Sequence, residues 1–472
     1  MDDRFAMSDA GELGGIVTCR NSQGSDLQGM LLKLDRHRVV FETYNPSIVL
    51  RTSEVLSDFS FSISETEAYS GTAVVATVLN TGAVTVCEAT LSDGWNEMDP
   101  FALPTLKKRL PAGFDQFMRQ WQKVYKLSPE YKVIIGNIQT FLIDLRLWLE
   151  RLELGIRASP DADRIELELE TARTLRPQVT ATLAQLFQGF EAVCGAIDEG
   201  AAPAHRVFGQ RQLHPHLLCA PFIYRTYAKP LGYAGDYEMM NMIVRNGYEG
   251  GSLYGKLVNA WLLDQDGPQA VRNRIGFLTN KLVEETGRVA RSGKIASIFC
   301  VACGPAWEIV QFMAEQPLAD HARFDLLDFN EETLQYATGK LNETKKKHAR
   351  KTELKLIKNS VQNLLRGGAK GIAKYDLVYC SGLYDYLNDR ICRALNTYFY
   401  DLLLPGGLLV VGNFGPHLPV KHFIEHFLEW FLIYRDPKQL TAVAPEQARP
   451  ENCAVIAEPT GSNLFFEARR TG

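Results

Sequence analysis

The chain has 472 residues, of which 46% are hydrophobic and 22% charged, and its formal net charge at pH 7 is -4. This composition is typical of a folded globular protein with enough apolar residues for sizeable cores. The length predicts roughly two to four domains. The slight negative charge argues against a nucleic-acid-binding protein that depends on bulk positive charge, so we expect no nucleic-acid partner.

Nine cysteines are scattered along the chain, mostly inside apolar runs. An odd, dispersed set predicts reduced core thiols rather than a disulfide framework. No apolar run approaches the roughly 18 residues needed to cross a bilayer, so we expect no membrane span. The first residues, MDDRFAMSDAGELGG, include acidic side chains and no apolar segment. They predict no signal peptide and a cytoplasmic location.

Residues from about 14 to 100 form short runs rich in Val, Thr and Ser, separated by turn signals such as Asn80-Thr81-Gly82. Runs at 29–34, 38–44, 71–78 and 83–89 have the alternation of half-buried strands. Repeated short strands of this kind predict a small antiparallel barrel or sandwich.

Apolar residues then recur at spacings of three and four from about 113 to 157, and helical periodicity resumes from about 162 to 197. This periodicity predicts two helical stretches, separated by the break at Ser159-Pro160. Because each stretch has an apolar stripe to bury, we expect the two to pack antiparallel. Pro177 predicts a kink or a split in the second stretch.

From Lys294 onward, apolar strands alternate with helical segments, as in a parallel sheet built from βαβ units. The turn Pro459-Thr460-Gly461 predicts a closing hairpin. Before it, the aromatic residues of 420–434 predict one helix with an aromatic face. We therefore expect an α/β fold with a Rossmann-like sheet, preceded by a helical region and a small N-terminal β-barrel. The predicted sheet strands are 295–301, 324–328, 354–358, 375–379 and 407–412.

The first of these strands runs into a turn of small residues around Gly304, and a helix follows. Small residues let the backbone approach a ligand closely, and a helix N-terminus offers free N–H groups. The second strand ends at Asp328, about 24 residues later, where a carboxylate can accept both hydroxyls of an adenosine ribose. Asp325 is the competing candidate, but its side chain would leave the strand three residues too early.

One pair of cysteines and one pair of histidines have spacings that occur in metal sites. Cys300 and Cys303 form a C-x-x-C inside the strand and turn, without a second ligand pair nearby. His214 and His216 lack a carboxylate at ligand spacing. A structural zinc site needs four such ligands, so we expect no metal and no redox chemistry.

The runs CVACGPAWE, LLDFNEETLQYA, YDLVYCSGLYDYL and LLLPGGLLVVGNF resemble, in order and spacing, the successive motifs of class I S-adenosylmethionine-dependent methyltransferases. The usual first motif has three glycines, whereas this chain has Ala302, Gly304 and Ala306. The resemblance implies S-adenosylmethionine as the cofactor and a class I methyltransferase sheet.

The same resemblance implies a role for individual residues. The backbone around Ala302 and Gly304 would face the methionine part of the cofactor, and Asp328 would bind the ribose. Ser360 and Val361 fall where the adenine is usually recognised, although many relatives carry a carboxylate at the position of Ser360. The implied cofactor-binding set is completed by Pro305, Phe329 and Ser381.

Upstream of the sheet, residues 224–237 contain four tyrosines broken by Pro and Gly, which predicts a lid or binding loop. The pattern KPLGYAGDYEMMNMI, together with ACGPAWE, resembles a bacterial group of 3-hydroxypalmitic acid methyl ester synthases. The resemblance covers roughly residues 205–472. It implies O-methylation of the carboxylate of a fatty-acid-like or other small-molecule acid, in the synthesis of a quorum-sensing signal or a secondary metabolite.

Methylation of a carboxylate needs positioning rather than a strong base, because the carboxylate is already a nucleophile at neutral pH. What it needs is a cationic or hydroxyl donor that holds one carboxylate oxygen. The catalytic candidates come from the lid region and from the ends of the fourth and fifth strands: Tyr227, Tyr233, Arg272, Arg274, Tyr384 and His417.

Residues 14–100 also resemble, loosely, a PilZ-type barrel. The dinucleotide-binding members of that family carry an R-x-x-x-R arm and a D-x-S-x-x-G motif. Here the arm would lie near Arg20, and the nearest strand match, residues 57–62, lacks the final glycine. The resemblance implies a degenerate domain for interaction or homodimer contacts, without cyclic-di-GMP binding.

The predicted segments are a PilZ-like barrel at 1–104, a helical hairpin linker at 105–203, a helical lid or substrate region at 204–290 and the cofactor-binding domain at 291–472. Two alternatives stay open. One is a cyclase or another enzyme that consumes S-adenosylmethionine without methyl transfer. The other is a regulatory protein linked to cyclic-di-GMP, whose methyltransferase fold acts as a sensor.

Overall fold

A computed structural model describes residues 15–35, 37–43, 50–63, 66–80, 84–93, 114, 118, 127–367 and 373–471. The chain divides into two compact units. Unit 1 comprises Met1–Ala234, Gly247–Leu262 and Val420–Phe431, and unit 2 comprises Gly235–Asn246, Leu263–Pro419 and Leu432–Gly472. The predicted barrel and helical hairpin thus lie in unit 1, whereas the predicted lid region contributes to both units.

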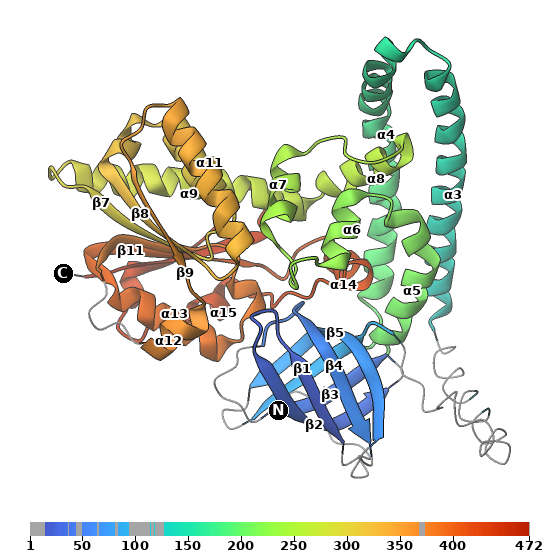
Figure 1. The fold of residues 1–472 in the computed structure, drawn as a ribbon, viewed down its shortest axis with the longest axis horizontal. Coiled ribbons are helices and arrows are strands. Elements are labelled where there is room, and N and C mark those ends of the chain that lie inside the picture. The colour runs from blue at the N-terminus through green and yellow to red at the C-terminus, as the bar shows by residue number, and fades with distance from the viewer. Residues whose placement is uncertain are drawn as a thin grey trace. The chain divides into compact units, whose positions relative to one another are not determined.

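The N-terminal strands of unit 1 close into a barrel with the order β1-β2-β3-β6-β5-β4, and every neighbouring pair is antiparallel (Figure 1). Side chains alternate between the interior and solvent, as the alternating sequence requires. Phe41, Phe59 and Phe61 lie in the resulting core. The predicted small antiparallel barrel is confirmed. Its strands are β1 (Ile16–Arg20), β2 (Asp26–Asp35), β3 (Arg38–Thr43), β4 (Val55–Ile63), β5 (Thr66–Asn80) and β6 (Thr85–Leu91).

Two long helices of unit 1, α3 (Pro129–Arg157) and α4 (Asp161–Cys194), pack against each other as a hairpin (Figure 1). Ser128 caps α3, because its hydroxyl accepts a hydrogen bond from the backbone N–H of Tyr131. The predicted helix pair is confirmed from Pro129 onward, whereas the predicted start of the first stretch, at 113–126, lies almost wholly outside the described residues. The helix α4 runs through Pro177 without a split. The shorter helices of this unit are α5 (Ala202–Leu217), α6 (Pro221–Ala228), α8 (Leu253–Leu263) and α14 (Lys421–Phe427).

The prediction of a single helix over 420–434 is wrong, because α14 ends at Phe427. Glu429 has a φ of 47°, in the left-handed region, which a continuing α-helix cannot contain. The chain passes from unit 1 to unit 2 after Phe431, so its next residues join a different core. Within α14, the ring of Phe423 lies 5.0 Å from that of Phe187 on α4.

Unit 2 is built on a seven-stranded sheet with the order β12-β13-β11-β10-β7-β8-β9. The strands β7 to β11 are parallel, whereas β13 runs antiparallel to β11 and forms a hairpin with β12. This arrangement confirms the predicted α/β fold, its Rossmann-like sheet and the closing hairpin. The strands are β7 (Ala296–Val301), β8 (Ala322–Asp328), β9 (Glu353–Lys358), β10 (Tyr375–Cys380), β11 (Leu403–Phe414), β12 (Cys453–Ala457) and β13 (Asn463–Arg469).

Helices cover both faces of this sheet, with α9 and α11 on one side and α12, α13 and α15 on the other (Figure 1). None of the helices in the described part of the chain is long and apolar enough to span a membrane. The helices of unit 2 are α7 (Tyr237–Arg245), α9 (Asp266–Ala290), α10 (Trp307–Glu315), α11 (Glu331–Lys347), α12 (Val361–Gly367), α13 (Asp389–Asp401), α15 (Pro437–Ala442) and the 3-10 helices η2 (Pro317–His321), η3 (Tyr384–Tyr386) and η4 (Pro450–Asn452).

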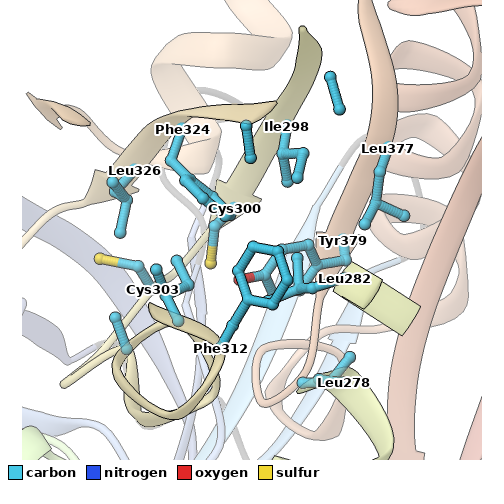
Figure 2. Packing of buried hydrophobic residues seen from close by; sticks show 14 of the residues in the cluster. Leu278, Leu282, Ile298, Cys300, Cys303, Phe312, Phe324, Leu326, Leu377 and Tyr379 are labelled. Carbon is cyan, nitrogen blue, oxygen red and sulfur yellow. The ribbon is translucent and has the colours of Figure 1, made fainter. Parts of the chain in front are cut away.

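The core between the sheet and α9 and α10 contains both cysteines of the C-x-x-C pair. Figure 2 shows Cys300 and Cys303 among Phe312, Phe324 and Tyr379. Burial raises the pKa of both thiols well above the usual value, so neither forms a thiolate readily. No group of three or more metal-binding side chains occurs among the described residues. Both cysteines are therefore packed as small apolar side chains.

Candidate functional site

The turn between β7 and α10 has an unusual backbone. Ala302, Gly304 and Ala306 all have a positive φ, of 53°, 53° and 54°. This conformation costs an alanine about 1–2 kcal/mol, so contacts with the surrounding structure must hold the turn in place. Part of that support is the hydrogen bond from the N–H of Cys303 to the carbonyl of Leu327 on β8, at 3.0 Å. The predicted turn from strand to helix is a tightly constrained loop.

Asp328, the last residue of β8, is bound directly to this turn. Its Oδ2 accepts a hydrogen bond from the backbone N–H of Gly304 at 3.1 Å, and its Oδ1 accepts one from that of Asn330 at 3.0 Å. The residue is only 5% exposed. The structure thus joins the two residues that the sequence analysis paired.

The competing carboxylate, Asp325, is engaged elsewhere. Its Oδ2 accepts a hydrogen bond from the hydroxyl of Tyr375 on β10, at 2.7 Å. The side chain therefore lies along the sheet rather than at the end of β8. This placement favours Asp328 over Asp325 as a ligand-binding carboxylate.

The ends of the neighbouring strands carry the other residues of the predicted cofactor set. The backbone N–H of Asn359 donates to the carbonyl of Asp328 at 3.0 Å, which places the end of β9 beside the end of β8. Ser360 follows directly, half-buried, and Val361 begins α12. Phe329 is half-buried after β8, Pro305 is buried within the turn, and Ser381 is half-buried after β10.

The segment Gly235–Asn246, which carries α7, forms hydrogen bonds with α10 and α11, the two helices that begin at this edge of the sheet. Asn241 accepts a hydrogen bond from the indole N–H of Trp307, the first residue of α10, at 2.8 Å. The hydroxyl of Tyr237 donates to Glu332, in the first turn of α11, at 2.7 Å. The part of the predicted lid that belongs to unit 2 is thus an ordered helix docked beside the glycine turn.

Arg274 on α9 lies at the end of β10. Its Nη1 donates to the carbonyl of Ser381 at 2.6 Å, and its Nη2 lies 3.6 Å from the sulfur of Met240 on α7. The side chain is 8% exposed, and the other N–H groups have no acceptor among the described residues. Burial lowers the pKa of this guanidinium, and the nearby Asp385 and Glu308 raise it. An arginine remains charged under these conditions, so the site presents a buried cation.

Two of the catalytic candidates in unit 2, Arg272 and Tyr384, form hydrogen bonds with other parts of the same unit. Arg272 donates to the backbone carbonyls of Ile243 and Leu263, at 3.2 and 2.9 Å. Tyr384 is buried and donates its hydroxyl to Asn396 at 2.7 Å. Both side chains thus make hydrogen bonds within the protein that stabilise its fold.

The other three candidates are dispersed. His417 lies exposed in the turn after β11. Tyr227 and Tyr233 belong to unit 1, where Tyr233 pairs through its backbone with Glu54 of the barrel. Tyr227 lines a cavity of about 600 Å³ between the barrel and the helices α5 and α6, and its ring packs against that of His214 with the centroids 4.5 Å apart. Burial and the negative charges of Glu429 and Asp93 raise the pKa of Tyr227 to about 12.

Sequence reasoning missed two buried acids near Arg274. Glu308, in the first turn of α10, accepts a hydrogen bond from the hydroxyl of Tyr379 at 2.7 Å, and burial raises the pKa of this carboxyl. Asp385 accepts from the side-chain amide of Asn413 at 3.0 Å, and burial raises its pKa to about 6. The signal for Glu308 was an acidic residue four positions after Gly304, at the start of an otherwise apolar helix.

Arg20, predicted near the arm of a PilZ-type barrel, makes ion pairs with Asp26 and Asp58 at 2.9 and 3.0 Å. All three side chains are about half exposed or more, so these pairs contribute little to stability.

No protein-family model and no curated protein matches this chain. Several solved structures resemble it. A possible exported protein of Bordetella parapertussis is 15% identical, covering 64% of this chain and 97% of its own, with a TM-score of 0.41. The magnesium protoporphyrin IX methyltransferase of Synechocystis, solved with S-adenosylmethionine, is 13% identical over 44% of this chain and 82% of its own, with a TM-score of 0.31. The N-methyltransferase NodS of Bradyrhizobium japonicum, solved with S-adenosyl-L-homocysteine, is 14% identical over 50% of this chain and 98% of its own, with a TM-score of 0.30.

Proposed function

We propose that the protein binds S-adenosylmethionine at the carboxyl edge of the sheet in unit 2 and transfers its methyl group to a small-molecule acid. The observation that carries the proposal is the hydrogen bond between the N–H of Gly304 and the carboxylate of Asp328. This bond holds the turn beside the carboxylate that we assign to the ribose, at the edge where ligands bind in open parallel sheets.

The space at the turn fits such a cofactor. A Cβ added to Gly304 would have no heavy atom within 4 Å, so the turn borders open volume. The methionine part would lie against the backbone of Ala302, Gly304 and Pro305, and the ribose hydroxyls would donate to Asp328. The adenine would lie beside Phe329 and the Ser360–Val361 segment, and Ser381 would face the cofactor from the end of β10.

The acceptor site of the proposal is built on Arg274. When bound, the cofactor supplies a methyl group that its sulfonium has already activated. The chain must then hold a carboxylate oxygen in line with that methyl and exclude water. A guanidinium with unused N–H groups binds a carboxylate in a planar, two-point geometry. The helix α7, which contacts Arg274 through Met240, would shield this position from solvent.

The acceptor class follows from Arg274 together with the sequence resemblance to methyl ester synthases. A fatty-acid-like acid, or another small acid for a signal or a secondary metabolite, is the substrate that we propose. No general base is needed, because the carboxylate attacks in its ionised form. This role suits a site whose nearby acids, Glu308 and Asp385, are themselves buried and hydrogen-bonded.

Isothermal titration calorimetry with S-adenosylhomocysteine tests the cofactor site through two isosteric variants. Asp328→Asn removes charge-assisted hydrogen bonds to the ribose, each worth about 1.5–3 kcal/mol, so affinity should fall by roughly tenfold or more. Asp325→Asn is the matched control and should bind normally, since the carboxylate of Asp325 accepts its hydrogen bond from Tyr375 within the sheet. Wild-type protein that does not bind, or a loss confined to Asp325→Asn, would refute the assignment.

Methyl transfer is tested by incubating the protein with S-adenosylmethionine and a panel of saturated, 3-hydroxy and aromatic acids. Formation of S-adenosylhomocysteine that depends on an added acid supports the proposal. Methylthioadenosine formed without any acid would instead identify an enzyme that cleaves or cyclises the cofactor. Binding of the cofactor without either product would support a sensor.

A further inference from the structure

Unit 1 contains a cavity of about 600 Å³ that the reaction proposed for unit 2 does not use. Strands β4, β5 and β6 of the barrel contribute to its wall, and so do helices α5 and α6. The residues of α5 that line the cavity recur at spacings of three and four, which places them on one face of the helix. They include Gln210, Arg211 and His214. The volume is that of a small-molecule binding site.

The most deeply buried charge on the cavity wall is the carboxylate of Glu429, which is 8% exposed. Its Oε1 accepts a hydrogen bond from the side-chain amide of Gln210 at 3.2 Å. Its Oε2 accepts none from the part of the chain that the structure describes. Buried polar groups normally have a hydrogen-bond partner, so the second oxygen of Glu429 is a binding position for a donor.

The backbone of Glu429 supports this interpretation. Its φ is 47°, in the left-handed region that residues other than glycine rarely adopt. Such residues persist only where their surroundings hold them, and they concentrate at functional sites. Here Gln210 does so, because its side-chain amide donates both to Glu429 and to the carbonyl of His426, at 2.8 Å. The carboxylate is therefore held at a fixed place on the wall.

Two buried cations lie near Glu429 but donate to other groups. The ammonium of Lys229 donates to two backbone carbonyls, the closer at 2.9 Å. The guanidinium of Arg206 donates to the hydroxyl of Thr90 at 3.4 Å. Burial lowers the pKa of both cations, and the negative charge of Glu429 raises it. Since neither forms an ion pair with Glu429 in the described structure, a donor from a ligand can reach the carboxylate.

The wall beside Glu429 offers acceptors and an aromatic face. Nε2 of His214 lies 3.0 Å from the carbonyl of Phe427 and must donate to it, because a carbonyl only accepts. Burial lowers the pKa of His214, so the ring is neutral and Nδ1 is an acceptor. The ring of Tyr227, 4.5 Å from that of His214, can bind a cation on its face. Tyr227 also lies within electrostatic reach of Glu429 and of the exposed Asp93, a second carboxylate of the wall.

We propose that this cavity binds an organic cation, namely a primary ammonium on an alkyl or arylalkyl chain. The ammonium donates to Oε2 of Glu429 and lies beside the ring of Tyr227. The apolar chain lies along Val55, Val74 and Val207, which line the same cavity. An ammonium has three N–H donors and no acceptor, so it matches a wall whose deepest charge is a carboxylate.

The charges of the wall select this ligand over an acid. A carboxylate ligand would be repelled by Glu429 and Asp93. It could pair with Arg211, but that side chain is exposed and lies at the solvent side of the wall. The proposal concerns unit 1 and does not rest on the reaction proposed for unit 2.

Isothermal titration calorimetry of the full chain with 2-phenylethylamine tests the proposal, and 2-phenylethanol and 3-phenylpropionate are the matched neutral and anionic probes. The wild type should bind the amine at least tenfold more tightly than the alcohol, and the acid should not bind. Glu429→Gln keeps the shape and removes the charge, so affinity for the amine should fall by roughly tenfold or more.

Two variants serve as controls. Glu425→Gln removes an equal charge from a carboxylate that precedes Glu429 by four residues and does not line the cavity, so the affinity for the amine should stay within about twofold. Arg211→Gln removes the positive charge of the wall and should leave that affinity unchanged or raise it. Should circular dichroism show that Glu429→Gln does not fold, Tyr227→Leu replaces it, since loss of the half-buried ring should also weaken binding of the amine.

Three results would overturn the proposal. The first is a wild type that does not bind the amine at millimolar concentrations, and the second is equal affinity for the amine and the alcohol. The third is a folded Glu429→Gln variant that binds the amine as tightly as the wild type does. Binding of 3-phenylpropionate that Arg211→Gln abolishes would identify an anion site instead and would also contradict the proposal.

Discussion

At Gly304, one added methyl group should lower the free energy of unfolding only slightly but weaken ligand binding strongly. Its φ is +53°, so Gly304→Ala pays about 1–2 kcal/mol for a left-handed alanine. The substitution also reduces the conformational entropy of the unfolded chain, which stabilises the folded state by about 0.4–1 kcal/mol. Because no atom lies within 4 Å of the new Cβ, no clash adds to this. We expect a net loss of about 1 kcal/mol in the free energy of unfolding.

The same methyl group would enter the space that we assign to the methionine part of the cofactor. The affinity for S-adenosylhomocysteine should therefore fall by roughly tenfold or more, which is 1.4 kcal/mol of binding energy or greater. Gly293→Ala is the matched control, with a φ of +72° and nothing within 4 Å, in the turn before β7. Urea unfolding should show similar losses of stability in the two variants, whereas calorimetry should show weaker binding only for Gly304→Ala. Equal affinities would refute the placement of the cofactor beside Gly304.

Three further changes probe the surroundings of the site. Arg274→Lys keeps the charge but loses the planar two-point geometry, so the KM for the acid should rise by roughly tenfold or more while the affinity for S-adenosylhomocysteine stays within about twofold; equal losses in both would contradict its role. Asp385 has its pKa raised by burial to about 6, above the ordinary 3.8, so the folded state holds this proton more tightly than the unfolded state. The free energy of unfolding should consequently fall by up to about 3 kcal/mol as the pH rises from about 4 to about 6, and Asp385→Asn should flatten that slope in urea titrations; an unchanged slope would assign it to other groups. Tyr379→Phe removes a hydrogen bond to the buried Glu308 and should lower the free energy of unfolding by about 1–3 kcal/mol, whereas a change below about 0.5 kcal/mol would show that the carboxyl finds another donor.

The barrel and the parallel sheet could be predicted because their signals are local. Alternation in residues 14–100 and the βαβ rhythm after Lys294 follow directly from which faces are buried. The link between Gly304 and Asp328 could also be predicted, since both follow the ends of neighbouring strands. Such ends meet at one edge of a parallel sheet whatever the intervening helices do.

Contacts between buried polar groups could not be predicted in the same way. Tyr384 and Arg272 carry side chains suited to binding an acid, yet their partners, Asn396 and the carbonyls of Ile243 and Leu263, are set by packing. Arg274, two residues from Arg272 on the same helix, has the less satisfied guanidinium. Periodicity cannot distinguish the two arginines, because the difference depends on what faces each of them.

The end of the aromatic helix at Phe427 was equally hidden from the sequence. Residues 420–434 have helical spacing throughout, and no Gly or Pro interrupts them. The helix stops because the chain must leave one core and enter another after Phe431. That requirement comes from the tertiary structure and leaves no local signal.

The interleaving of the two units along the chain has a consequence for synthesis. Unit 1 takes its last segment from Val420–Phe431, where the rings of Phe423 and Phe427 lie 5.0 and 5.2 Å from those of Phe187 and Phe190. A ribosome releases these residues only after the unit 2 segment Leu263–Pro419, so unit 1 cannot finish folding before unit 2 begins to fold, unlike the units of chains built from successive domains. The nascent chain must carry an incomplete hydrophobic core until Phe431 has emerged, and a fragment that ends at residue 234 would expose the same aromatic surface.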